Sequence, residues 1–175
     1  MNFFPIFGTG LARSGGHLYN NCLSAHPEIM VANCPNLELF RSYRNAMIRD
    51  LRNEKFLKEC PADSPLLDWY GTNRRIQILE YMLEKANLDN EFDPREWKSF
   101  YKNSVRRGNL ESSKDLTKNF RSLKGKTYKE IFINLLLIIK DSRNCHKKKW
   151  IGFHEVWIID FFPILARAFR NAHFI

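Results

Sequence analysis

The fold is decided by residues 3–27, which read FFPIFGTGLARSGGHLYNNCLSAHP. The stretch opens with a short apolar run, residues 3–7, whose aromatic side chains are typical of a buried strand. Residues 8–16 follow and contain four glycines, after which apolar residues recur at helical spacing as far as Pro27. The chain therefore begins with a strand, a glycine loop and a helix, and His26 before the proline is expected to end that helix.

Strands and helices continue to alternate after this first unit. The expected strands are 28–32, 150–153 and 173–175, and the expected helices are 37–57, 74–86, 127–140 and 160–170. Such alternation predicts an α/β fold, with a parallel sheet flanked by helices. Residues 87–126 are polar and are expected to form helix pieces and loop.

The whole chain, residues 1–175, is expected to be a single domain. Hydrophobic residues make up 44% of it and aromatic residues 14%, which argues against a disordered chain. The sequence stops inside an apolar strand, so we expect the sheet to be incomplete at the C-terminus.

The formal net charge is +9, which favours an anionic partner such as a phosphorylated small molecule, nucleic acid or an anionic surface. The four cysteines, at positions 22, 34, 60 and 145, fit no zinc spacing and are typical of reduced thiols in a cytoplasmic protein. Neither a signal peptide nor an apolar run of membrane-spanning length is visible. The expected location is therefore the cytoplasm.

The glycine loop carries the chemistry that the sequence predicts. Its glycines let several backbone N–H groups converge, and the following helix adds its unpaired N–H groups and the positive end of its dipole. Gly10 and Gly15 fit the two glycines of the Walker A pattern, but Gly16 and His17 occupy the positions where that pattern needs Lys and Ser or Thr. The loop is thus expected to bind a phosphate-like dianion without a metal ion.

Two blocks of sequence resemble the sulfotransferase family. Arg13-Ser14-Gly15-Gly16-His17-Leu18, followed by Ala25-His26-Pro27-Glu28-Ile29, resembles that family's 5′-phosphosulfate loop, and residues 150–175 resemble its approach to the second donor-binding strand. The resemblance implies a P-loop-like fold, with the loop at 8–18, a helical acceptor-side region at about 37–142 and a second strand–helix unit at 149–175. It also implies 3′-phosphoadenosine-5′-phosphosulfate (PAPS) as co-substrate and no metal.

The resemblance also implies a set of residues that hold the donor. These are Gly10, Ala12, Arg13, Ser14, Gly15, Gly16, His17 and Leu18. Gly16 and His17 replace two hydroxyl residues of the usual loop, and the family's 3′-phosphate motif would lie beyond residue 175. These 175 residues alone are therefore expected to bind only the 5′-phosphosulfate half of the donor and to be inactive by themselves.

Three side chains are candidates for catalysis. Glu38 follows the second strand, where several sulfotransferase branches place a glutamate, and is the leading base; the alternative is an exposed helix residue. His17 is the other candidate base, against the alternative of a passive cap at the helix start. His154 is expected at the carboxyl edge of the sheet, where it would stabilise charge or serve as a structural histidine, and Glu155 is a weaker candidate of the same kind.

The leading hypothesis is a sulfotransferase that transfers a sulfuryl group to a hydroxyl or amine of a carbohydrate or other small molecule. The alternatives are a P-loop nucleotide kinase or NTPase, a non-catalytic basic module that binds nucleotides or polyanions, and a nucleotide-binding relative that has lost turnover. Because the basic residues are scattered and no nucleic-acid-binding motif is visible, nucleic acid is not the expected partner.

Overall fold

The computed structural model describes residues 3–10, 14–33, 84–93, 122–156 and 161–175, together with residues 39, 42, 43, 46, 96, 115 and 119. The expected helices at 37–57 and 74–86 lie mostly outside the described residues, as do Ala12, Arg13 and Glu38.

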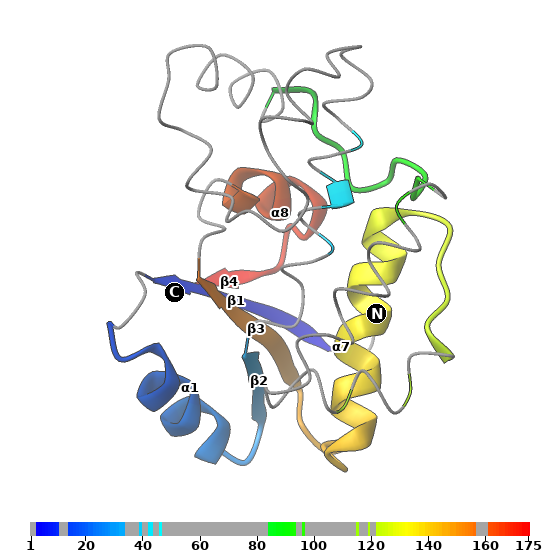
Figure 1. The fold of residues 1–175 in the computed structure, drawn as a ribbon. Helices are drawn as coiled ribbons and strands as arrows, with labels where there is room; N and C mark the ends of the chain where they lie inside the picture. Colours follow the sequence, from blue (N-terminus) through cyan, green and yellow to red (C-terminus); the bar gives the residue numbers. More distant parts are fainter. Residues whose placement is uncertain are drawn as a thin grey trace.

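The described residues form a parallel sheet of four strands (Figure 1). The strands are β1 (Phe4–Gly10), β2 (Ile29–Asn33), β3 (Trp150–Val156) and β4 (His173–Phe174). Their order across the sheet is β2-β3-β1-β4, so β3 pairs with β2 on one side and with β1 on the other. The predicted α/β class with a parallel sheet is confirmed.

Two strands are longer than the sequence predicts. The strand expected at 3–7 continues through Gly8 to Gly10, because the ladder with β3 persists over these residues although two of the three are glycines. The strand expected at 150–153 continues to Val156, because its ladder with β1 extends over residues 154–156. His154 therefore lies within β3 and does not follow it, and the glycine loop is shorter than residues 8–16.

Helices cover both faces of the sheet. Helix α1 (Gly16–Ala25) lies on one side, whereas α7 (Tyr128–Ser142) lies on the other (Figure 1). Helix α8 (Phe162–Ala168) shares the α7 side, since its buried Ile164 and Leu165 belong to the same apolar cluster as α7. Pro163 lies in the first turn of α8, where the lack of an N–H is harmless.

The core is centred on the Phe7 ring, which is fully buried between the sheet and the two helices on the α7 side. Its centroid lies 4.9 Å from that of Phe153 on β3 and 5.6 Å from that of Phe132 on α7. It also lies 5.5 Å from the ring of Phe169 and 5.6 Å from that of Phe174. These edge-to-face and tilted contacts join the sheet to the helices on its α7 side through one side chain.

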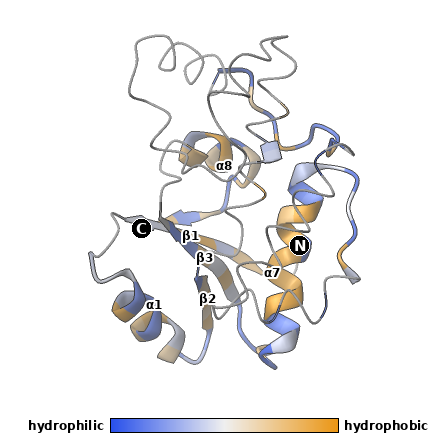
Figure 2. Cartoon of the chain, in the orientation of Figure 1, coloured by the Kyte–Doolittle hydropathy of each residue, from blue (hydrophilic) through white to orange (hydrophobic). Residues whose placement is uncertain are grey.

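Helix α7 is held by its apolar face and by its N-terminal cap. Ile131, Leu135 and Ile139 recur at helical spacing and are fully buried, and Figure 2 shows the apolar colouring along the helix. The predicted capping box is present: the Thr127 hydroxyl accepts from the N–H of Glu130 at 3.2 Å. The Glu130 carboxylate in turn accepts at 2.7 Å from the N–H of Lys126, one residue earlier than the usual reciprocal bond.

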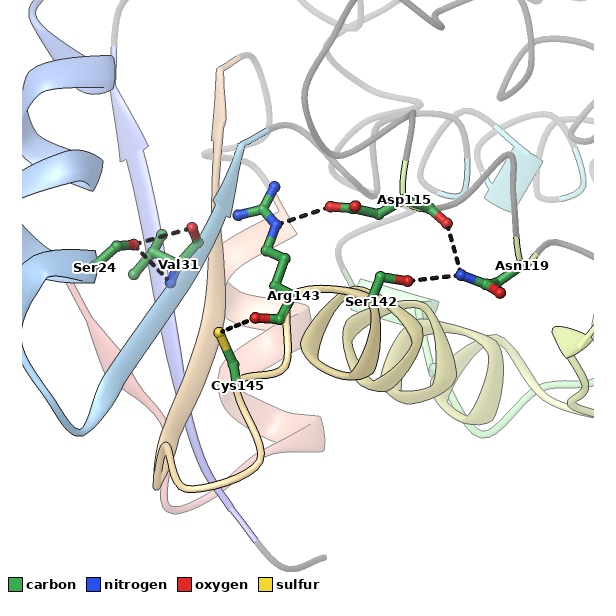
Figure 3. Close-up of polar contacts among 7 residues, drawn as sticks. All are labelled: Ser24, Val31, Asp115, Asn119, Ser142, Arg143 and Cys145. Atoms are coloured by element: carbon green, nitrogen blue, oxygen red, sulfur yellow. Dashed lines mark hydrogen bonds and ion pairs between the residues drawn. The ribbon is translucent and has the colours of Figure 1, made fainter.

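Polar contacts secure the ends of α1 and α7 (Figure 3). At the end of α7, the Arg143 guanidinium donates at 2.8 Å to the carboxylate of Asp115, and Asn119 donates at 2.7 Å to the Ser142 hydroxyl. At the end of α1, the Ser24 hydroxyl accepts from the N–H of Val31 on β2 at 3.2 Å.

The carboxyl end of α1 is also capped from the far part of the chain. His26 is the C-cap residue, as expected from the sequence. The Lys148 ammonium donates to the carbonyl oxygens of Ser24, at 2.9 Å, and of His26, at 2.7 Å. A cation at this position also favours the helix dipole. Helix α1 is thereby fixed to the segment that leads into β3.

Candidate functional site

The candidate site lies at the carboxyl edge of the sheet, between β1 and β3. The two strands end side by side, with Gly10 opposite Val156 in the parallel register. The connection after β1 leads to β2 at one edge of the described sheet, whereas the connection after β3 leads past β1 to β4. Ligands of open α/β sheets bind where connections diverge in this way.

Helix α1 begins at this edge, and its N-cap residue contributes no side-chain hydrogen bond to the first turn. Its N-cap residue, Gly15, has a φ of 86°, a left-handed conformation that glycine adopts without strain. The first turn carries no acidic residue. The first intrahelical bond runs from the N–H of Tyr19 to the carbonyl of Gly15 at 3.1 Å. The preceding N–H groups, those of Gly16, His17 and Leu18, have no hydrogen-bond acceptor within the helix itself.

The ring of His154 lies directly beneath this helix start and is 5% exposed. A Cβ added at Gly16 would lie 2.5 Å from its Cε1 atom. A Cβ at Gly10 would lie 3.3 Å from its Nε2 atom, and one at Gly8 would lie 3.2 Å from its Cδ2 atom. Three glycines thus form the walls around the imidazole, so they admit a buried ring as well as shaping a turn.

Burial lowers the pKa of His154, and the neighbouring His17 lowers it further. The ordinary value is about 6.5, so the ring is neutral at pH 7 in the free protein. A neutral imidazole offers one donor and one acceptor nitrogen. An anion bound nearby would favour the charged form of the ring and would raise the same pKa.

A chain of side-chain hydrogen bonds runs beside the helix start. Asn20 on α1 donates at 2.6 Å to Oδ1 of Asn33, at the end of β2. The amide nitrogen of Asn33 lies 2.8 Å from Nδ1 of His17. Asn33 is also the strand neighbour of His154 in the β2–β3 register. The three side chains join α1 and β2 at the same edge of the sheet.

The sequence-predicted site residues that the structure describes come together here. Gly10, Ser14, Gly15, Gly16, His17, Leu18 and His154 all lie at this edge, and Ser14 Oγ lies 3.2 Å from the Cβ position of Gly10. The side chain of Leu18 is 70% exposed, so only its N–H suits the predicted role. Ala12, Arg13 and Glu38 lie outside the described residues.

Glu155 does not join this group, because its side chain alternates to the opposite face of β3 from His154. It is fully buried, and the Thr9 hydroxyl donates to its backbone carbonyl at 2.8 Å. Its backbone therefore ties β3 to β1 at the edge where the site lies.

Sequence reasoning missed Asn20 and Asn33. A signal for both was present: Asn20 lies three residues after His17 on the expected helix, and Asn33 follows the expected second strand. What the sequence lacked was the strand order, which places the end of β2 beside β3.

Among the described residues, no group of three or more His, Cys, Asp or Glu side chains is arranged to hold a metal ion. Within the same residues, no helix has both the length and the apolar composition that a membrane crossing requires.

Comparisons with protein-family models, with curated proteins and with solved structures found no match to this chain.

Proposed function

We propose that this chain carries the 5′-phosphosulfate site of a sulfotransferase and that the start of α1 holds this end of PAPS. The observation that carries the proposal is the helix start itself: an αL glycine at the N-cap position, which places no side chain over the first turn, and a first turn without acidic residues. This arrangement suits a dianion.

In sulfuryl transfer, an acceptor hydroxyl or amine attacks the sulfur in line, and the donor phosphate leaves. The protein must position the donor and stabilise the charge that develops on the leaving phosphate. The N–H groups of Gly16, His17 and Leu18 are suited to that second task, together with the Ser14 hydroxyl and the Arg13 guanidinium that the family resemblance implies.

The hydrogen bonding of His17 bears on its proposed role. Its Nδ1 faces an amide N–H₂ donor, so the neutral ring carries its proton on Nε2. We therefore assign His17 as a donor to the bound anion, and Glu38 stays the proposed base for the acceptor. His154, neutral and buried below the loop, would take up positive charge when the dianion binds.

Calorimetry with 3′-phosphoadenosine-5′-phosphate, the donor's product, tests the proposal. We expect binding without magnesium, weakened about tenfold or more by Arg13→Ala, because a charge-assisted hydrogen bond contributes about 1.5–3 kcal/mol. Arg170→Ala is the matched control, since Arg170 is exposed and lies before β4, at the amino end of the strand.

The competing functions give different results in the same experiment. A kinase or NTPase would bind ATP in a magnesium-dependent manner. A polyanion-binding module would bind any polyanion with an affinity that falls steeply with salt. Equal binding by the wild type and Arg13→Ala, or no binding at all, would refute the proposed site.

A further inference from the structure

We propose that Asn33 is a positioning residue for His17: the chain Asn20–Asn33–His17 fixes which ring nitrogen carries the proton and presents Nε2–H as a donor at the start of α1. That the Nε2–H group of His17 binds an anion rests on the proposed function, whereas the hydrogen bonds from Asn20 to Asn33 and from Asn33 to His17 do not.

The direction of these hydrogen bonds follows from the orientation of the Asn20 and Asn33 amide groups. Asn20 is 3% exposed, and its amide nitrogen donates to Oδ1 of Asn33 at 2.6 Å. With its oxygen engaged on Asn20, the Asn33 amide turns its nitrogen toward His17. An amide N–H₂ can only donate, so Nδ1 of His17 must be the acceptor.

The consequence for His17 is a fixed tautomer and a fixed ring orientation. A neutral imidazole whose Nδ1 accepts carries its proton on Nε2, on the side of the ring away from Asn33. His17 is exposed in the first turn of α1, so this N–H is open to a solute at the helix start. Without Asn33 the ring would rotate and exchange tautomers, and a bound anion would have to order it again.

The first test needs no ligand. Two-bond ¹H–¹⁵N correlations of the ¹⁵N-labelled protein report the tautomer of each histidine, and His17→Gln identifies the His17 signals. We expect neutral His17 with a protonated Nε2 and an unprotonated Nδ1. In Asn33→Asp, the carboxylate still accepts from Asn20 but can no longer donate, so the proton should move to Nδ1 of His17. A wild-type Nδ1–H tautomer, or no change in Asn33→Asp, would overturn the proposal.

The second test is a double-mutant cycle on the affinity for 3′-phosphoadenosine-5′-phosphate. Asn33→Ala should weaken binding about 2- to 10-fold, the range of one neutral hydrogen bond. The same change should have no effect in a His17→Ala background, because Asn33 is proposed to act only through His17. Asn21→Ala, an exposed asparagine on the same helix, should have no effect in either background.

The two readouts separate the two proposals. If the tautomer responds to Asn33→Asp but no variant binds the nucleotide, the positioning role stands and the proposed function fails. If the nucleotide binds but Asn33→Ala weakens binding equally with and without His17, the positioning role fails and the proposed function stands.

Discussion

The buried histidine of the site links stability to pH. In the unfolded chain the His154 imidazole titrates near its ordinary pKa of about 6.5, whereas burial holds its pKa lower in the folded protein. Between these two values the unfolded state binds more protons, so the free energy of unfolding falls as the pH is lowered through about 6.5 and recovers above it.

We therefore expect the wild type to lose more stability between pH 7.5 and pH 5 than His154→Gln does. Urea unfolding followed by circular dichroism at several pH values measures this difference. Glu28, whose pKa is lowered by Lys149, titrates below this window and does not contribute to it. Parallel curves for the two proteins would contradict the assignment of a neutral, buried His154.

Gly16→Ala tests the contact between α1 and the same ring. Replacing glycine by alanine where the backbone is compatible stabilises a protein by about 0.4–1 kcal/mol, but the Cβ would lie 2.5 Å from Cε1 of His154, and overpacking of this kind costs about 1–3 kcal/mol. We expect net destabilisation of the wild type, measured by urea unfolding. In a His154→Ala background the clash is removed, so the same substitution should stabilise the protein. Destabilisation by Gly16→Ala in both backgrounds would show that the contact with the His154 ring does not cause the loss of stability.

At the scale of the elements, an exposed hydrogen bond caps the start of α7, a helix that packs on the core. The Thr127 hydroxyl accepts from the N–H of Glu130, and this bond fixes the start of the helix that covers β2 and β3. Loss of such an N-cap costs about 0.5–2 kcal/mol. We expect Thr127→Ala to be destabilised by that amount in thermal or urea unfolding.

Thr127→Ser and Thr127→Asp are the matched controls, because both retain a side-chain oxygen at the cap and should keep most of the stability. If all three variants lost the same stability, packing of the threonine methyl group, and not the cap, would be the cause.

The elements also show where sequence reasoning succeeds and where it stops. The apolar run at residues 3–7, the spacing in α1 and the box at Thr127 are local signals, and each gave the right kind of element. The strand ends at Gly10 and Val156 were misjudged, because pairing with a neighbouring strand and not the side chain keeps the backbone extended there. The local pattern of glycines also could not reveal that they enclose a histidine from a distant strand.

At the scale of the whole molecule, the site depends on residues far apart in the chain. The class of fold was predictable, since alternating strands and helices favour a parallel sheet. The strand order was not, because it is fixed by pairings such as Phe4 with Trp150 and Ile29 with Trp150. Arg13 and Glu38, on which the chemistry of the resemblance depends most, lie outside the described residues.

The insertion of β3 between β1 and β2 has a consequence for how the protein is made. The first two strands never pair with each other, so the amino-terminal strand–helix–strand segment has no ladder of its own when it leaves the ribosome. The edges of β1 and β2 stay unpaired until β3, more than a hundred residues later in the chain, pairs with both strands. The same pairing places His154 beside the glycines. Such late closure makes folding slow and leaves unpaired strand edges exposed to other chains during synthesis.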